Sequence, residues 1–155
     1  MNDFDFYTGT WDVRNRRRTD FLEDSCFLEE ATDWEEFPAI SVAGRHLGGL
    51  ANFDEIEFPT KDLRGITLRL FDRGREEWSL YWVGGRTPTL TTPVVGRFVD
   101  GRGEFLGDDA IDGREIRVRY IWSDMSATSA HWEQAFSVDG ERTWITNWTM
   151  DSTRR

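Results

Sequence analysis

Hydrophobic and polar side chains alternate along much of this chain with a period of two, the pattern of β-strands that bury one face. In the segment 114–122, for example, mostly charged residues alternate with four apolar or aromatic ones: Ile116, Val118, Tyr120 and Trp122. Clusters of turn-forming residues interrupt the alternation at intervals of roughly ten to fifteen residues. The pattern therefore predicts a series of antiparallel strands joined by tight turns.

Two Asp-Gly dipeptides, at positions 100–101 and 112–113, are strong signals for two-residue hairpin turns. Folding the chain about them predicts that Arg97 lies opposite Glu104 on one face and that Phe98 lies beside Phe105 on the other. It also predicts that Phe105 lies opposite Tyr120. A turn at Arg73-Gly74 predicts three further pairs: Ile66 with Trp82, Leu68 with Leu80, and Leu70 with Trp78. Each register gathers the large apolar residues on one face, and this agreement supports a common buried surface.

The segment 131–148 carries the strongest concentration of aromatic residues. A hairpin folded about Gly140 predicts three pairs that share a face: Phe136 with Trp144, Gln134 with Thr146, and Trp132 with Trp148. Gln134 and Thr146 are the polar members of this aromatic wall. A polar pair within such a wall indicates a lined cavity rather than a plain core.

Strands are also predicted over Trp34–Val42 and Arg45–Phe58, with a bulge or sharp bend at Gly48-Gly49. The segment Asp20–Glu30 is the best candidate for one short helix or an irregular loop. We therefore expect a single all-β domain over residues 1–155. The predicted fold is an antiparallel up-and-down barrel of eight to ten strands with at most one short helix, and a β-sandwich is the alternative.

Charge and composition restrict the classes of partner. The chain has 155 residues and a net charge of −10, which argues against nucleic acid and against an anionic membrane surface. The single Cys26 cannot form an intrachain disulfide, which suits a reducing compartment. The first residues lack the pattern of a signal peptide, and no apolar run approaches the length of a membrane span. We expect a cytoplasmic protein, and the sequence leaves the oligomeric state open.

No motif for a metal or nucleotide cofactor is present. Two isolated histidines and one cysteine do not provide the clustered ligands of a metal site. The glycine-rich loops that bind phosphates are absent, and so is the Gly-x-Ser-x-Gly turn that carries a catalytic serine. We therefore expect neither metal nor cofactor.

One polar group could support acid–base chemistry. His46, Asn52 and Asp54 have the same parity along one strand-like segment and would share a face. If that face is internal, Asp54 becomes a candidate general acid or base, with His46 or Asn52 as its orienting partner. Alternatively, the Gly48-Gly49 bulge reverses the parity, or Asn52 and Asp54 only satisfy backbone groups in a bend.

Gly9-Thr10-Trp11 opens the first predicted strand, and Arg154-Arg155 ends the chain. This arrangement resembles the lipocalin and wider calycin barrels. The resemblance implies that Trp11 packs at the closed end of a barrel beneath an arginine from the last strand. More broadly, the segments Phe4–Trp11, Leu47–Glu55 and Trp132–Trp148 resemble a family of lipocalin-like bacterial proteins, and this implies a fold without a particular activity.

Two other resemblances are narrower. Nitrobindin-type haem barrels carry Gly-x-Trp-x-Gly-x-Gly, whereas Trp11 is followed here by Asp-Val-Arg, and His131 is predicted on the face opposite Trp132. We therefore expect no haem. The segment 137–144 reads Ser-x-Asp-Gly-x-x-Thr-Trp and is similar to the Asp-box of sialidase-like propellers, which implies a structural turn and no glycosidase.

These features predict that the barrel interior binds a small, largely apolar, aromatic or polyketide-like molecule. The predicted ligand-binding residues are Trp82, Tyr120, Trp122, Trp132, Gln134, Thr146 and Trp148. A first alternative is a metal-independent isomerase, cyclase or dehydratase with Asp54, His46 and Asn52 as catalytic residues. A second is a structural barrel that binds a protein partner through an apolar outer patch.

Overall fold

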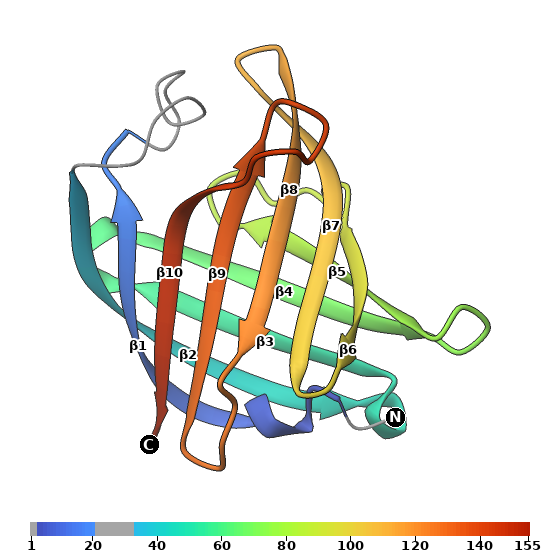
Figure 1. Cartoon of the computed structure of the whole chain (residues 1–155). Helices are drawn as coiled ribbons and strands as arrows, with labels where there is room; N and C mark the ends of the chain where they lie inside the picture. Colours follow the sequence, from blue (N-terminus) through green and yellow to red (C-terminus); the bar gives the residue numbers. More distant parts are fainter. Residues whose placement is uncertain (1–2, 21–32) are drawn as a thin grey trace.

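A computed structural model describes residues 3–20 and 33–155, and the described chain forms a closed antiparallel β-barrel. Ten strands follow one another around the barrel, and β1 pairs with β10 to close it (Figure 1). The strands are β1 (Gly9–Arg18), β2 (Trp34–His46), β3 (Ala51–Phe58), β4 (Leu63–Asp72), β5 (Glu77–Gly84), β6 (Val94–Val99), β7 (Arg102–Ile111), β8 (Arg114–Ser123), β9 (Ser129–Ser137) and β10 (Ile145–Arg154). The predicted up-and-down barrel is confirmed, and the sandwich alternative is wrong.

The described residues contain three short 3-10 helices: η1 (Asp5–Tyr7), η3 (Leu47–Gly49) and η4 (Pro59–Lys61). None of the helices in this described part is long and apolar enough to cross a membrane. The candidate helix at 20–30 lies, apart from its first residue, outside the described residues, as does Cys26.

The registers predicted from the two Asp-Gly turns are confirmed. Arg97 pairs with Glu104 across β6 and β7, and Phe105 pairs with Tyr120 across β7 and β8. Asp100 and Gly101 both have positive φ angles, of 51° and 77°, as a two-residue hairpin turn of the mirror-image type requires. The turn chemistry alone therefore fixes which side chains of β6, β7 and β8 point inward.

The register predicted for β4 and β5 is wrong by one residue. Asp72 pairs with Glu77, so a four-residue turn joins the strands, and the Asp72 carboxylate accepts hydrogen bonds from the backbone N–H groups of Gly74 and Arg75 at 2.8 and 3.1 Å. A shift of one residue moves every side chain of a strand to the other face. The actual pairs are Thr67 with Trp82, Arg69 with Leu80, and Phe71 with Trp78. Thr67 and Arg69 therefore face the interior, and Ile66, Leu68 and Leu70 face outward.

The predicted pairing of β9 with β10 is also wrong. The register shifts between Thr146 and Trp148, where Asn147 forms a bulge. The observed pairs are Phe136 with Ile145, Ala135 with Thr146, Gln134 with Trp148, and Trp132 with Met150. Trp132 and Trp148 still share the inner face because the bulge restores the parity, and their rings meet edge to face at 6.0 Å.

The segment 45–58 is not one strand, because η3 separates β2 from β3 at the predicted bend. Gly48 and Gly49 have φ angles of +66° and +99°, which residues with a Cβ rarely adopt. His46 pairs with Ala51 across this turn. The turn therefore breaks the simple alternation on which a shared face for His46 and Asp54 depended.

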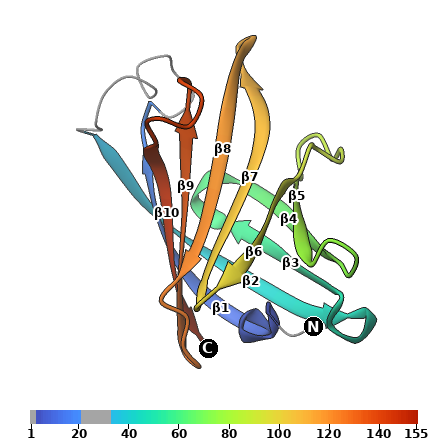
Figure 2. The same cartoon turned by 45° about the vertical axis from the view of Figure 1, so that its right-hand side comes forward.

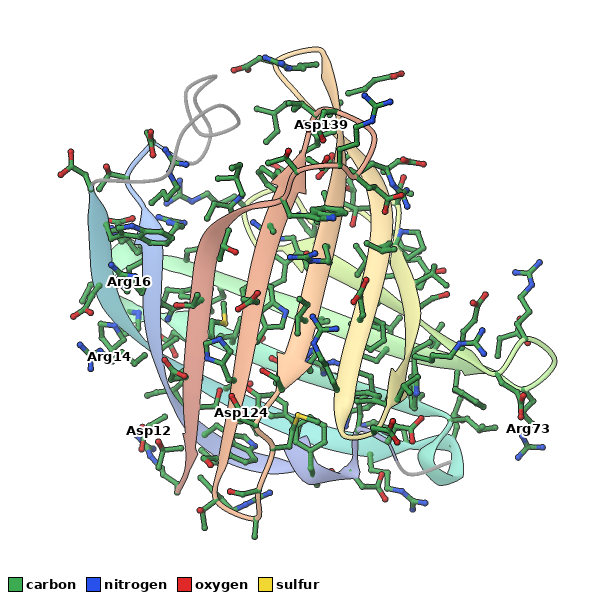
Figure 3. The ribbon with its side chains drawn as sticks, viewed as in Figure 1. Asp12, Arg14, Arg16, Arg73, Asp124 and Asp139 are labelled. Carbon is green, nitrogen blue, oxygen red and sulfur yellow. The ribbon has the colours of Figure 1, made fainter. Side chains whose placement is uncertain are left out.

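The outer face of the barrel is strongly charged. Asp12, Arg14 and Arg16 project outward from β1 (Figure 3). Arg14 donates two hydrogen bonds to the Glu36 carboxylate on β2, at 2.9 and 2.8 Å. Such exposed ion pairs contribute little to stability individually.

One end of the barrel is closed by an aromatic plug, which we define as Phe4, Tyr7, Trp11, Trp78 and Phe105. All five side chains are almost inaccessible to solvent. The guanidinium of Arg154 lies 4.3 Å from the centre of the Trp11 ring and donates hydrogen bonds to the carbonyl groups of Phe6, Thr8 and Ala127. The segment containing η1 lies across this end, and the β7–β8 turn extends beyond the opposite end (Figure 2).

Candidate functional site

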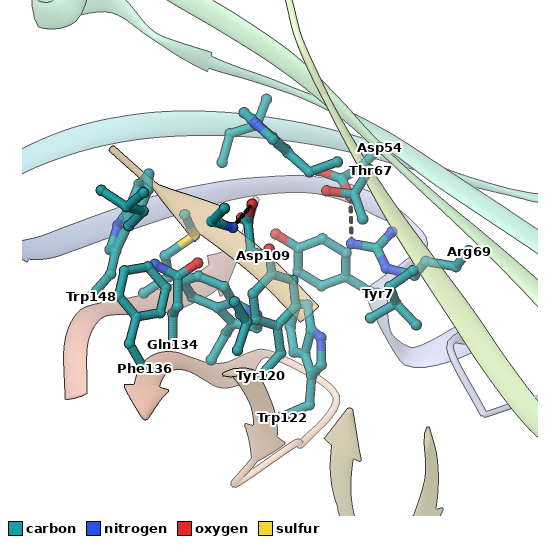
Figure 4. A pocket seen from close by; sticks show the side chains of 18 residues that line it. Tyr7, Asp54, Thr67, Arg69, Asp109, Tyr120, Trp122, Gln134, Phe136 and Trp148 are labelled. Atoms are coloured by element: carbon teal, nitrogen blue, oxygen red, sulfur yellow. Dashed lines mark hydrogen bonds and ion pairs between the residues drawn. The ribbon is translucent and has the colours of Figure 1, made fainter. Parts of the chain in front are cut away.

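A cavity of about 380 Å³ lies inside the barrel. Six of the seven predicted ligand-binding residues line it: Trp82, Tyr120, Trp122, Trp132, Gln134 and Trp148 (Figure 4). The seventh, Thr146, does not, because it pairs with Ala135 on the other face of the strand pair. The remaining lining is mainly apolar and includes Ile56, Leu80, Val118 and Phe136.

Trp82 reaches the cavity wall because Gly65, which lies diagonally across from it on β4, has no side chain. A Cβ atom added at Gly65 would lie only 2.1 Å from the Trp82 ring. The indole therefore occupies the space above Gly65, and any larger residue there would displace it. This close approach fixes one aromatic wall of the cavity.

A buried ion pair between Arg69 and Asp54 lies beside the aromatic plug at the inner end of the cavity. We call this pair, together with Asn52 and Ser41, the polar floor. Arg69 donates hydrogen bonds to Asp54 at 2.5 Å and to Asn52 at 2.7 Å. The Ser41 hydroxyl donates a hydrogen bond to the second Asp54 oxygen at 2.8 Å. None of the four residues is more than a few per cent exposed. The two charges can remain buried because they are paired and hydrogen-bonded.

The structure brings two of the three candidate catalytic residues together. Asp54 lines the cavity, and Asn52 lies next to it through their shared partner Arg69. His46 is exposed on the outer surface, where its ring stacks on Phe53 at 4.7 Å. The η3 turn causes this separation, so the proposed partnership of His46 with Asp54 is wrong.

Sequence reasoning missed Thr67 and Arg69, because the one-residue error in the β4–β5 register placed both on the outside. The signal that could have found them is Asp72, whose carboxylate stabilises the four-residue turn. A second signal is Asp54 itself, because an internal carboxylate needs a cationic partner.

Two tyrosines near the cavity resist ionisation. Burial, reinforced by the negative charge of Asp54, raises the pKa of Tyr7 to about 12. Burial, reinforced by the charge of Asp109, raises the pKa of Tyr120 to about 12. Both hydroxyl groups therefore keep their protons at neutral pH.

The cavity opens to solvent beside a short strand pairing. β5 and β6 form only three residue pairs, from Trp78 with Gly96 to Leu80 with Val94. A second hollow of about 630 Å³ lies here and shares Trp82, Asp109 and Tyr120 with the cavity. Its lining also includes Asp108 and Glu115, so the mouth of the cavity is acidic.

In the part of the chain that the structure describes, no group of three or more His, Cys, Asp or Glu side chains could hold a metal ion. His131 lies on the outer face, where its Nδ1 is 2.7 Å from an oxygen of Asp151. The hairpin loop that resembles an Asp-box is a structural turn, in which the Asp139 carboxylate accepts hydrogen bonds from the Ser137 hydroxyl and the Thr143 N–H at 2.9 Å each. No family model matches this chain, and no curated protein matches it closely enough to indicate a relationship.

Proposed function

We propose that the barrel binds a small, largely apolar, aromatic or polyketide-like molecule in its interior. The observation that carries this proposal is the 380 Å³ cavity itself, whose wall is aromatic and aliphatic with few polar groups. A volume of this size and a lining of this kind are typical of small-molecule sites. A barrel filled by side chains alone would leave no such space.

The aromatic wall is held in place before any ligand arrives. The Trp132 ring meets Tyr120 edge to face at 5.0 Å and Trp148 at 6.0 Å. The Trp148 indole N–H donates a hydrogen bond to Asn15 at 3.0 Å. A wall fixed in this way binds a rigid ligand without a large loss of side-chain entropy.

The likeness of Gly9-Thr10-Trp11 and Arg154 to the lipocalin and calycin pattern supports the same proposal. Trp11 and Arg154 are stacked at the closed end, as that resemblance implied. Barrels of that class hold one small ligand inside.

Tryptophan fluorescence tests the proposal directly. We expect polycyclic aromatic compounds such as 2-naphthol to quench the wild-type emission with a saturable dependence on concentration. Trp132→Phe removes an indole from the cavity wall and should reduce the amplitude of the quenching. Trp34→Phe is the matched control, because Trp34 lies on the barrel wall beside Arg16 and does not line the cavity. Absence of saturable quenching across a panel of apolar aromatic compounds would contradict the proposal.

The first alternative, a metal-independent isomerase, cyclase or dehydratase, is favoured by one observation, the buried carboxylate of Asp54 beside the cavity. Against it, both oxygens of this carboxylate are already held by Arg69 and Ser41. Proton transfer would require one of these contacts to break. Under the enzyme hypothesis, Asp54→Asn abolishes turnover and spares ligand affinity.

The second alternative, an interaction barrel, is favoured by the outward face of β3 and β4. Phe53 pairs with Leu68, and Leu68 pairs with Tyr81, so three apolar or aromatic side chains form a row across the outer surface. Phe53 is 40% exposed. This row is where a protein partner would bind if the cavity proved unable to take a ligand.

A further inference from the structure

Among the polar atoms of the cavity wall that have no hydrogen-bond partner, two lie on side chains that face one another across neighbouring strands. Tyr120 and Gln134 are directly opposite one another on β8 and β9, and both side chains line the cavity (Figure 4). Among the described residues, neither the Tyr120 hydroxyl nor the side-chain oxygen of Gln134 forms a hydrogen bond. Both atoms remain accessible from the cavity, since neither is among the fully buried unpaired atoms.

The nitrogen end of the Gln134 amide is bound to a neighbouring amide. This nitrogen donates a hydrogen bond to Asn147 at 2.9 Å, at the bulge of β10. The amide oxygen is therefore the end that is free, and it can only accept a hydrogen bond.

The Tyr120 hydroxyl complements this acceptor. Burial and the nearby charge of Asp109 raise the pKa of Tyr120 to about 12, so the hydroxyl is protonated at neutral pH and available as a donor. One donor and one acceptor thus stand side by side on the same face. A single hydroxyl group satisfies both, because it donates one hydrogen bond and accepts another.

The polar floor does not offer a comparable anchor for an anion. The charge of Arg69 is balanced by Asp54 at 2.5 Å, and its other terminal nitrogen is bound to Asn52. Asp109 adds a negative charge between the cavity and its mouth. These charges disfavour a carboxylate ligand.

We propose, on the basis of the binding function above, that the ligand is a neutral hydroxylated aromatic molecule, of the phenol or enol class. Its hydroxyl group donates to the Gln134 side-chain oxygen and accepts from the Tyr120 hydroxyl. A ketone or ether would satisfy Tyr120, but on displacing water from the cavity it would leave the Gln134 oxygen without any hydrogen bond, which is costly. The aromatic ring lies among Trp82, Trp132 and Trp148.

Equilibrium dialysis with three matched probes tests this assignment: 2-naphthol, 2-methoxynaphthalene and naphthalene. For the wild-type protein we expect 2-naphthol to bind at least tenfold more tightly than 2-methoxynaphthalene, because the methyl ether cannot donate to Gln134. Gln134→Met should remove this preference for the hydroxyl. Tyr120→Phe should remove any preference for the ether over the hydrocarbon. Phe136→Leu is the control, since it alters the apolar wall and should change all three affinities by a similar factor.

The possible outcomes separate the two proposals. Equal binding of the three probes would overturn the hydroxyl assignment and leave the binding function intact. A preference for 2-naphthol that survives in Gln134→Met would also overturn it, and so would tighter binding of 2-naphthoate than of 2-naphthol. Failure of every probe to bind to wild-type protein would contradict the binding function itself.

Discussion

The two ends of the barrel use tryptophan in different ways. In the aromatic plug, the indole N–H of Trp11 donates to the Tyr7 carbonyl at 2.8 Å, and that of Trp78 donates to Asp3 at 2.9 Å. Both rings are fully buried. In the cavity wall, Trp82 is only half-buried, and Trp132 makes its ring contacts with other wall residues.

The difference shows that a tryptophan ring belongs to the core where another side chain packs against it, and forms a binding surface where the space beside it is empty. Phe4 packs against Trp78 at 4.9 Å between ring centres, so a side chain fills the space beside this indole. The space beside Trp132 is open cavity. Close packing stabilises the plug, whereas the wall gives up some of that contact energy and keeps room for a ligand.

Truncation of one tryptophan from each region should separate the two roles most strongly. We expect Trp78→Ala to lower the free energy of unfolding by about 3–5 kcal/mol, because it leaves a void in a filled core. Trp132→Ala enlarges an existing cavity and should cost clearly less. Urea denaturation of both variants measures the difference, and equal losses of stability would contradict the distinction between plug and wall.

The ion pair of the polar floor lies where the two regions meet. Asp54→Asn leaves Arg69 as a buried charge without its counter-ion, and we expect a loss of roughly 3 kcal/mol in the free energy of unfolding. The double variant Asp54→Asn with Arg69→Met removes both charges and should recover part of that loss. A double variant less stable than Asp54→Asn would show that the pair contributes more than charge compensation.

The tyrosines allow a spectroscopic comparison of the regions. Tyr7 and Tyr120 should both ionise near pH 12 in an ultraviolet absorbance titration of the folded protein. Because both pKa values are raised, the folded state retains protons that the unfolded chain loses, and stability should fall as the pH rises above about 10. Asp54→Asn should lower the pKa of Tyr7 and leave that of Tyr120 unchanged. Equal movement of both would contradict the separate environments.

The strand registers of the two hairpins with Asp-Gly turns could be predicted correctly from the sequence. Asp100-Gly101 and Asp112-Gly113 permit one register each, and the structure has both. The Arg73-Gly74 turn indicates its register less clearly, since it is stabilised by hydrogen bonds that the backbone N–H groups of Gly74 and Arg75 donate to the Asp72 carboxylate and not by an Asp-Gly pair. An error of one residue in the predicted register of this hairpin exchanges the inner and outer faces of β4.

The residues of the candidate site could be predicted where the strands alternate regularly between inward and outward side chains. Tyr120, Trp122, Trp132 and Gln134 lie inside because β8 and β9 are regular in this region. Arg69 was not predictable in this way, because Ile66, Leu68 and Leu70 form an equally regular apolar set on the opposite face of β4. Thr146 was predicted on the wrong face because no glycine or proline marks the bulge at Asn147 in the sequence.

The smallest expected effect comes from the outer face, which neither region uses. Burial alone lowers the pKa of His131, but hydrogen bonds and the charges of Asp151 and Glu133 outweigh it, so the net shift is upward. The stabilisation is fully present below the unfolded pKa of about 6.5 and is lost as the pH rises through the higher folded value. We expect wild-type protein to lose less than about 1 kcal/mol of stability between pH 6 and pH 9 through this group, as is typical of surface ion pairs. Urea denaturation of His131→Gln should show that this pH-dependent part of the stability is lost. The affinity of the variant for 2-naphthol should be unchanged. An unchanged pH dependence in His131→Gln would assign the effect to other groups, and a weaker affinity would link the outer face to the cavity.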